Sequence, residues 1–132
     1  MAPAQATATY GCGIWGGTTA ELHATQSGSS VTIRVRTGIA TPVAIDAGTM
    51  TTTLRMARNG TDVAVFTGSS NPLIPGYGAF DSGPLTSTTG FVPGDTLDSY
   101  LGPSLGLTLT VIGVTVECQA TAPQFPGPFV VD

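Results

Sequence analysis

Very few residues of this 132-residue chain could carry out chemistry, and its two cysteines are the most informative of them. Cys12 and Cys118 bracket almost the whole sequence. Two cysteines placed in this way favour a structural disulfide, a bond that persists in oxidising compartments such as the extracellular space. We therefore predict a Cys12–Cys118 disulfide that joins the first strand to the last, and no catalytic or metal-binding cysteine.

His23 is the only histidine, so a serine-hydrolase or other general-base mechanism would have to use it. It alternates outward beside Glu21, and the chain has no Gly-x-Ser-x-Gly nucleophile motif. One histidine and two paired cysteines also leave no cluster of metal ligands. We interpret His23 as a solvent-facing strand residue and predict no enzyme activity. The alternative is a hydrolase centred on His23, which requires a serine and an aspartate within hydrogen-bond reach.

Asp95 and Asp98 form the densest acidic pair in the sequence. They could be half of a calcium site or a pair of glycosidase carboxylates. The surrounding segment lacks the Asp, Asn and Gly density of a calcium loop, however. Residues 92–95 (Val-Pro-Gly-Asp) are more simply a turn in which Asp95 accepts backbone hydrogen bonds.

Residues 11–16 match the pattern G-x-G-x-x-G. Dinucleotide binding through this pattern needs a preceding strand and a following helix, so that the helix N-terminus meets the phosphates. Here a further strand follows, so we attribute the match to chance and predict no cofactor.

Three of the four arginines could form an anion-binding patch. Arg34 and Arg36 lie on one strand face, and Arg55 lies on the outward face of another strand. If those strands are neighbours, the patch could hold a carboxylate or a phosphate. The simpler interpretation is that these are solvated arginines paired with Glu21 or Asp62.

Charge and the distribution of apolar residues argue against two kinds of partner, nucleic acid and the membrane interior. The chain has a net charge of −4, whereas general nucleic-acid binding requires a basic surface. No apolar run approaches the roughly 20 residues of a membrane span. We therefore predict neither nucleic-acid binding nor membrane insertion.

The strongest interaction signal lies in two apolar loops, because exposed aromatic and aliphatic loop residues mark binding surfaces. The alternative is that these loops fold back and close the ends of the domain. The candidate contact residues are Leu73, Ile74, Tyr77 and Phe80 in the first loop and Tyr100 and Leu101 in the second.

The C-terminal tail, residues 122–132, contains three prolines that favour an extended form. Its apolar residues, Phe125 and Phe129 among them, need burial. We expect burial either against an edge of the same domain or against a partner by strand addition.

The elements that position these residues are β-strands. The chain holds 18 Gly and 10 Pro, is rich in Thr and Val, and has only 9% charged residues, which favours an all-β class. Alternation of period two marks strands at 19–25, 30–37 and 50–57, and Asn59-Gly60 predicts a tight hairpin into 62–66. The side chains predicted to face inward are Leu22, Ala24, Val31, Ile33, Val35, Thr52, Leu54 and Met56.

The segment 107–118 alternates in one phase before Gly113 and in the opposite phase after it, as at a β-bulge or bend. Alternate residues of 6–12 also share one phase. Both cysteines therefore continue inward-facing rows, which we interpret as pairing across the core.

Further short strands at 42–46, 78–81 and 85–88 bring the expected number to seven to nine. We predict a single Greek-key β-sandwich over residues 1–132, with a flexible N-terminus at 1–6 and the proline-rich tail at 122–132.

The N-terminal segment bears on localisation. Ala4-Gln5-Ala6 is similar to the end of a signal peptide, so we interpret Met1 as a start residue added to a mature secreted chain. A native start, as in a virion protein, is the alternative. The absence of Lys and the richness in Ala, Thr, Gly and Val favour a high-GC source such as an actinobacterium.

The opening 9–12 (Thr-Tyr-Gly-Cys) and the Thr/Val-rich segment ending at Cys118 resemble small secreted actinobacterial proteins with an immunoglobulin-like sandwich. In that group a Tyr-x-Cys start pairs with a last strand that ends in Cys. The resemblance implies an immunoglobulin-like fold and export, but no particular reaction.

We therefore predict a non-catalytic binding or adaptor module of the extracellular space or cell envelope. It would recognise a protein partner through the apolar loops and the tail. The alternatives are a phage virion decoration protein and a secreted protease inhibitor that acts through residues 71–77. The sequence makes no prediction of oligomeric state.

Overall fold

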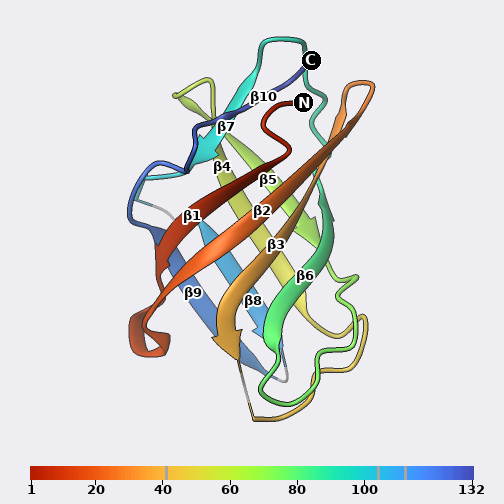
Figure 1. Cartoon of the computed structure of the whole chain (residues 1–132), viewed down its shortest axis with the longest axis vertical. Coiled ribbons are helices and arrows are strands. Elements are labelled where there is room, and N and C mark those ends of the chain that lie inside the picture. The colour runs from red at the N-terminus through yellow and green to blue at the C-terminus, as the bar shows by residue number, and fades with distance from the viewer. Residues whose placement is uncertain (41, 104, 112) are drawn as a thin grey trace.

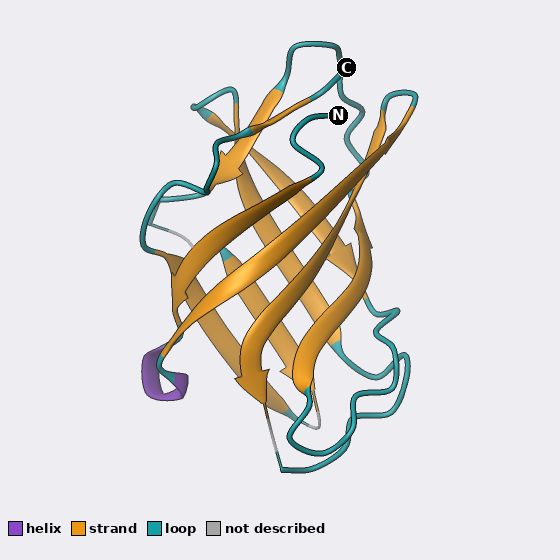
Figure 2. Cartoon of the chain, in the orientation of Figure 1, coloured by secondary structure: helices purple, strands orange, loops and turns teal. Residues whose placement is uncertain are grey.

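The computed structural model describes residues 1–40, 42–103, 105–111 and 113–132. Its regular secondary structure consists of β-strands and one short 3-10 turn, η1 (Gly13–Trp15), between the first two (Figures 1 and 2). The strands are β1 (Gln5–Gly11), β2 (Gly17–Ser27), β3 (Ser30–Ala40), β4 (Thr51–Arg58), β5 (Asp62–Gly68), β6 (Ala79–Thr86), β7 (Thr96–Ser99), β8 (Leu107–Val111), β9 (Val114–Ala120) and β10 (Phe129–Val130).

Eight of these strands close into an antiparallel barrel. Their order around the wall is β1-β2-β3-β6-β5-β4-β8-β9, and β9 returns to β1. The predicted sandwich is therefore wrong, and so is the immunoglobulin-like architecture that the resemblance implies. A sandwich needs two sheets with free edges, whereas here the pairing of β4 with β8 and of β1 with β9 closes the sheet on itself.

The barrel interior is filled by the inward rows of side chains. Every side chain predicted to face inward on β2, β3 and β4 is buried, which confirms those alternation patterns. An eight-stranded barrel is just wide enough for side chains to fill it. The largest fully buried ones include Phe66, Phe80, Phe129, Leu22, Ile33 and Leu54.

Two local predictions have different outcomes. Asn59 and Gly60 have φ values of 53° and 78°, and β4 pairs with β5 from Arg58–Asp62 onward, so the hairpin is confirmed. The segment 107–118, in contrast, is not one strand with a bulge. Gly113, with φ of 71°, lies in a tight turn, and β8 folds back on β9. The change of phase reflects this reversal of chain direction.

Between β1 and β4 the barrel wall is built at two levels (Figure 1). At the lower level β4 pairs with β8, and β9 pairs with β1. At the upper level β4 pairs with β7, β7 with β10, and Val130 of β10 bridges to Ala2 just before β1. Both chain ends therefore take part in the upper level of the wall.

The disulfide between Cys12 and Cys118 is confirmed. It continues the register of the β1–β9 pair, in which Tyr10 faces Ala120 and Gly11 faces Gln119. The two Cα atoms are 4.1 Å apart, so the bond joins adjacent strands and does not cross the core. It reinforces a seam where β1 and β9 share only two paired positions.

Among the described residues, no helix has the length and apolar character needed to cross a membrane.

Candidate functional site

His23 lies outward on β2, as the alternation predicts. Its Nε2 is 3.4 Å from Oε2 of Glu21, which is its only side-chain partner within the described part of the chain. No serine or aspartate is bonded to the imidazole there. The structure therefore does not assemble the triad that a hydrolase centred on His23 would require.

Asp95 and Asp98 have separate surroundings. Asp95 accepts hydrogen bonds from Asn59 Nδ2 at 3.0 Å, from the Val92 amide at 3.0 Å and from Arg58 Nη2 at 2.7 Å. The bonds from Asn59 and Val92, together with the Arg58 charge, lower the pKa of Asp95 to about 2. Asp98 instead accepts the amide of Gln124 at 2.9 Å. Asp95 thus fastens a turn to the β4–β5 hairpin.

A metal site is not formed by the described residues, since no three His, Cys, Asp or Glu side chains come together there.

The three arginines do not form one patch. On β3, Arg34 binds Asp81 through two hydrogen bonds of 2.8 Å, and Arg36 Nε donates to the same carboxylate at 3.1 Å. Partial burial disfavours the charged carboxylate, but the hydrogen bonds outweigh it and lower the pKa of Asp81. Arg55 lies on β4, which β6 and β5 separate from β3. Its Nη1 donates to the Leu105 carbonyl at 3.1 Å.

The predicted partner-binding residues divide into buried and exposed sets. Ile74, Phe80 and Phe129 are buried and belong to the core. Leu73, Tyr77, Leu101 and Phe125 are exposed, and Tyr100 is half-buried.

The C-terminal tail docks on its own barrel. Phe125 exchanges two backbone hydrogen bonds with Thr7, of 2.7 and 2.8 Å, and Val131 exchanges two of 2.9 Å with Gly94 and Asp95. The buried ring of Phe129 anchors the segment. Of the two modes of burial expected for the tail, the structure shows docking on the same domain.

One end of the barrel carries three exposed apolar side chains, Val43, Leu73 and Tyr77, on two neighbouring loops, and we call this set the apolar tip. Two loops build it, the β3–β4 loop and the β5–β6 loop, which lie side by side at the lower end in Figure 1. Two backbone hydrogen bonds of 2.8 and 2.9 Å between Ile45 and Ile74 join them, and both of these side chains are buried. The tip therefore has a rigid base.

Tyr77 occupies an unusual backbone position in this tip. The Gly78 amide donates to the Pro75 carbonyl at 2.8 Å, which makes Tyr77 the third residue of a β-turn. Its φ is 61°, in the left-handed region where glycine is the favoured residue. The side chain is nevertheless 80% exposed, so it gains little from burial in its own fold.

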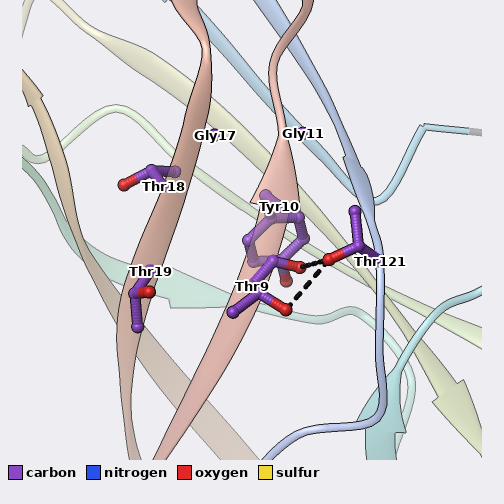
Figure 3. Close-up of a pocket in the computed structure, with 7 residues that line it drawn as sticks. All are labelled: Thr9, Tyr10, Gly11, Gly17, Thr18, Thr19 and Thr121. Atoms are coloured by element: carbon purple, nitrogen blue, oxygen red, sulfur yellow. Dashed lines mark hydrogen bonds between the residues drawn. The ribbon is translucent and has the colours of Figure 1, made fainter.

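A second surface was not anticipated from the sequence. A shallow depression of about 380 Å³ lies where β1 and β2 meet the start of the tail (Figure 3). Four threonines, two glycines and Tyr10 line it. Gly11 and Gly17, which face each other across β1 and β2, form part of its floor. Paired glycines at the ends of two adjacent predicted strands were the signal that could have found it.

Comparison with known proteins found no matching family model, no matching curated protein and no matching solved structure.

Proposed function

We propose that this protein is a non-catalytic binding module of the extracellular space or cell envelope, and that its apolar tip binds a protein partner. The observation that carries the proposal is Tyr77, an exposed aromatic side chain held at a backbone position that disfavours it. Left-handed backbone costs a non-glycine residue about 1–2 kcal/mol. Strain of this kind is concentrated at binding and catalytic sites.

The surroundings of Tyr77 fit a contact surface. Leu73, 64% exposed, and Val43, 60% exposed, extend the apolar area. Asp46 is the only charged residue in the described parts of the two loops. Tyrosine is among the residues that contribute most to binding energy, particularly when the base beneath it is rigid. The expected partner presents an apolar pocket with a hydrogen-bonding group for the phenol hydroxyl.

The disulfide supports the proposed location, because it would not persist in a reducing compartment.

The test compares wild type with Tyr77→Gly in capture of a protein from the secreted and cell-wall fractions of the source organism. A photo-crosslinking residue at Leu73 identifies the protein in contact, and its affinity is then measured with the purified partner. We expect Tyr77→Gly to weaken binding at least 30-fold, about 2 kcal/mol, while the barrel stays folded. Leu101→Ser, which removes an exposed apolar side chain outside the tip, is the matched control and leaves affinity unchanged.

Equal affinity of wild type and Tyr77→Gly would contradict the proposal. A dimer that sedimentation detects in wild type but not in Tyr77→Gly would show that the chain associates with itself through the tip. The tip would then bind a second copy of this chain and not a different protein.

A secreted protease inhibitor is a second candidate, favoured by the way Asn71 supports the exposed loop. Its buried side chain accepts the Met50 amide at 2.9 Å and donates to the carbonyls of Asp46 and Pro72. An inhibitor needs such a fixed, exposed loop. Assay against a panel of secreted proteases tests this, with Leu73→Asp as the variant that should abolish inhibition. Cleavage of the loop without inhibition would exclude it.

A further inference from the structure

We infer that the depression shown in Figure 3 is a binding site for a neutral carbohydrate chain. The site is named here the hydroxyl strip and consists of Thr9, Gly11, Gly17, Thr19 and Thr121. It shares no residue with the apolar tip, so it goes beyond the proposed function and stands or falls independently of it.

The first argument comes from the two glycines. Neither Gly11 nor Gly17 has a positive φ, so the backbone does not require glycine at either position. A Cβ on Gly11 would lie 3.7 Å from Thr121 Cγ2, and one on Gly17 would lie 3.6 Å from the Tyr10 carbonyl oxygen, both ordinary contacts. Glycine weakens a strand, and where the fold does not need it, it often marks a site of close approach by a ligand.

The second argument comes from the hydroxyl groups around this bare backbone. Thr9 Oγ1 and Thr121 Oγ1 are 2.9 Å apart, and Thr121 Oγ1 also reaches the Thr9 carbonyl at 3.3 Å, as Figure 3 shows. Thr19 Oγ1 has no partner within the described residues and is exposed. Each hydroxyl both donates and accepts, which matches the vicinal hydroxyls of a sugar. None of the residues that line this depression is charged.

The strip continues onto β3 through Thr19. This residue also lines a second depression, of about 320 Å³, together with Glu21 and Arg36. These two residues are cross-strand partners, and Arg36 donates only Nε to Asp81, which leaves its terminal nitrogens free toward solvent within the described structure. A carboxylate that accepts and a guanidinium that donates can bracket a further sugar ring. Two depressions that share Thr19 offer room for more than one sugar ring, which favours an oligosaccharide.

Other ligand classes fit less well. The opposite charges of Glu21 and Arg36 offset each other, so the surface has no excess positive charge for a phosphate chain. An extended peptide would need a free strand edge, but β1 is paired with β2 on one side and with β9 and the tail on the other. The loop between Gly11 and Gly17, which joins the two strands of the strip, carries the exposed Trp15.

Trp15 is the only tryptophan, so its fluorescence reports on this region. The experiment titrates the full chain with neutral oligosaccharides (β-1,4-linked N-acetylglucosamine, α-mannose and α- and β-glucose oligomers) and repeats any response by calorimetry. We expect saturable binding of at least one oligomer, with longer oligomers binding more tightly than monosaccharides. Absence of binding up to 10 mM for the whole panel would overturn the inference.

Two variants test the location of the site. Gly17→Val covers the bare backbone and should weaken binding at least tenfold, whereas Gly127→Ala, placed in open space elsewhere, should leave it unchanged. Thr19→Val removes one hydroxyl without changing side-chain shape and should weaken binding several-fold. It serves in place of Gly17→Val if that chain does not fold. Unchanged binding in the folded variants would refute the strip as the site. Tyr77→Gly, which tests the apolar tip, should bind the oligosaccharide as wild type does, so the two sites are tested separately.

Discussion

The apolar tip and the hydroxyl strip depart from the needs of the fold in opposite directions. At the tip, Tyr77 is a large side chain at a backbone position that favours glycine. On the strip, Gly11 and Gly17 are glycines at positions that would accept a side chain. In neither place is the residue present the one that the local backbone geometry favours. These residues, which the fold does not explain, lie where we propose that the protein contacts other molecules.

The largest effect is expected at a glycine that the fold does require. Gly83 on β6 has φ of 66°, and a Cβ there would lie 2.1 Å from the Ser70 carbonyl oxygen. Gly83→Ala must therefore displace the backbone and should cost at least about 3 kcal/mol of unfolding free energy. Denaturant unfolding followed by circular dichroism measures this. A loss below 1 kcal/mol would remove the contrast with Gly11 and Gly17.

The second-largest effect is expected from Asp95, whose hydrogen bonds hold the turn at residues 92–95 against the β4–β5 hairpin. We expect this residue to make the stability of the fold sensitive to acid. Its pKa of about 2 in the folded chain lies below the value of about 3.9 expected when unfolded. The stability it contributes is thus fully present above about pH 4 and is lost as the pH falls through about 2. The difference in unfolding midpoint between wild type and Asp95→Asn should shrink across that window. A difference independent of pH would contradict the hydrogen-bond network around Asp95.

A smaller effect of opposite sign is expected at the tip. Tyr77→Gly should raise the unfolding free energy by about 1 kcal/mol, because glycine relieves the left-handed strain. Tyr77→Ala is the matched control, since it removes the ring but keeps the strain and should show no gain. Thermal unfolding of the three proteins distinguishes the contributions. Equal stability of Tyr77→Gly and Tyr77→Ala would show that the backbone position is not strained.

The smallest effect is expected on the strip. Gly17→Ala should leave stability unchanged or raise it by about 0.5 kcal/mol, because alanine restricts the unfolded chain at a position whose geometry it fits. Urea denaturation is the measurement. A loss above 1 kcal/mol would mean that the fold does need this glycine, which would then require no ligand to explain it.

Local features of the fold could be predicted from the sequence, but its closure could not. The inward rows on β2, β3 and β4 follow from period-two alternation, which reports which face of a strand is buried. The same alternation occurs in sandwiches and in barrels, so it cannot distinguish them. Barrel closure depends on which strands pair at long range. One edge of β4, for example, pairs with β8 along its first half and with β7 along its second half. No local pattern records such a choice.

The candidate sites show the same limit. Apolar composition marked the loop around Tyr77, but it did not separate exposed Leu73 from buried Ile74, its neighbour in sequence. That separation depends on the bridge between Ile45 and Ile74, which joins two loops. The strip depends on Gly11 facing Gly17 across β1 and β2, and this register is known only from the structure. The structure also shows that neither glycine is required by the backbone conformation, which the sequence could not reveal.

The two-level wall between β1 and β4 has a consequence for how the chain is made. β1 precedes the other strands of the barrel in the chain, whereas the residues that pair with its outer edge, within 119–125, lie about a hundred positions later. Throughout synthesis and any transport of the unfinished chain, that edge presents unpaired backbone groups of the kind that recruit other strands. The barrel therefore cannot close until these residues have been synthesised, so its closure depends on late, long-range pairing. A chaperone that shields β1 would act during the period in which this edge is still unpaired.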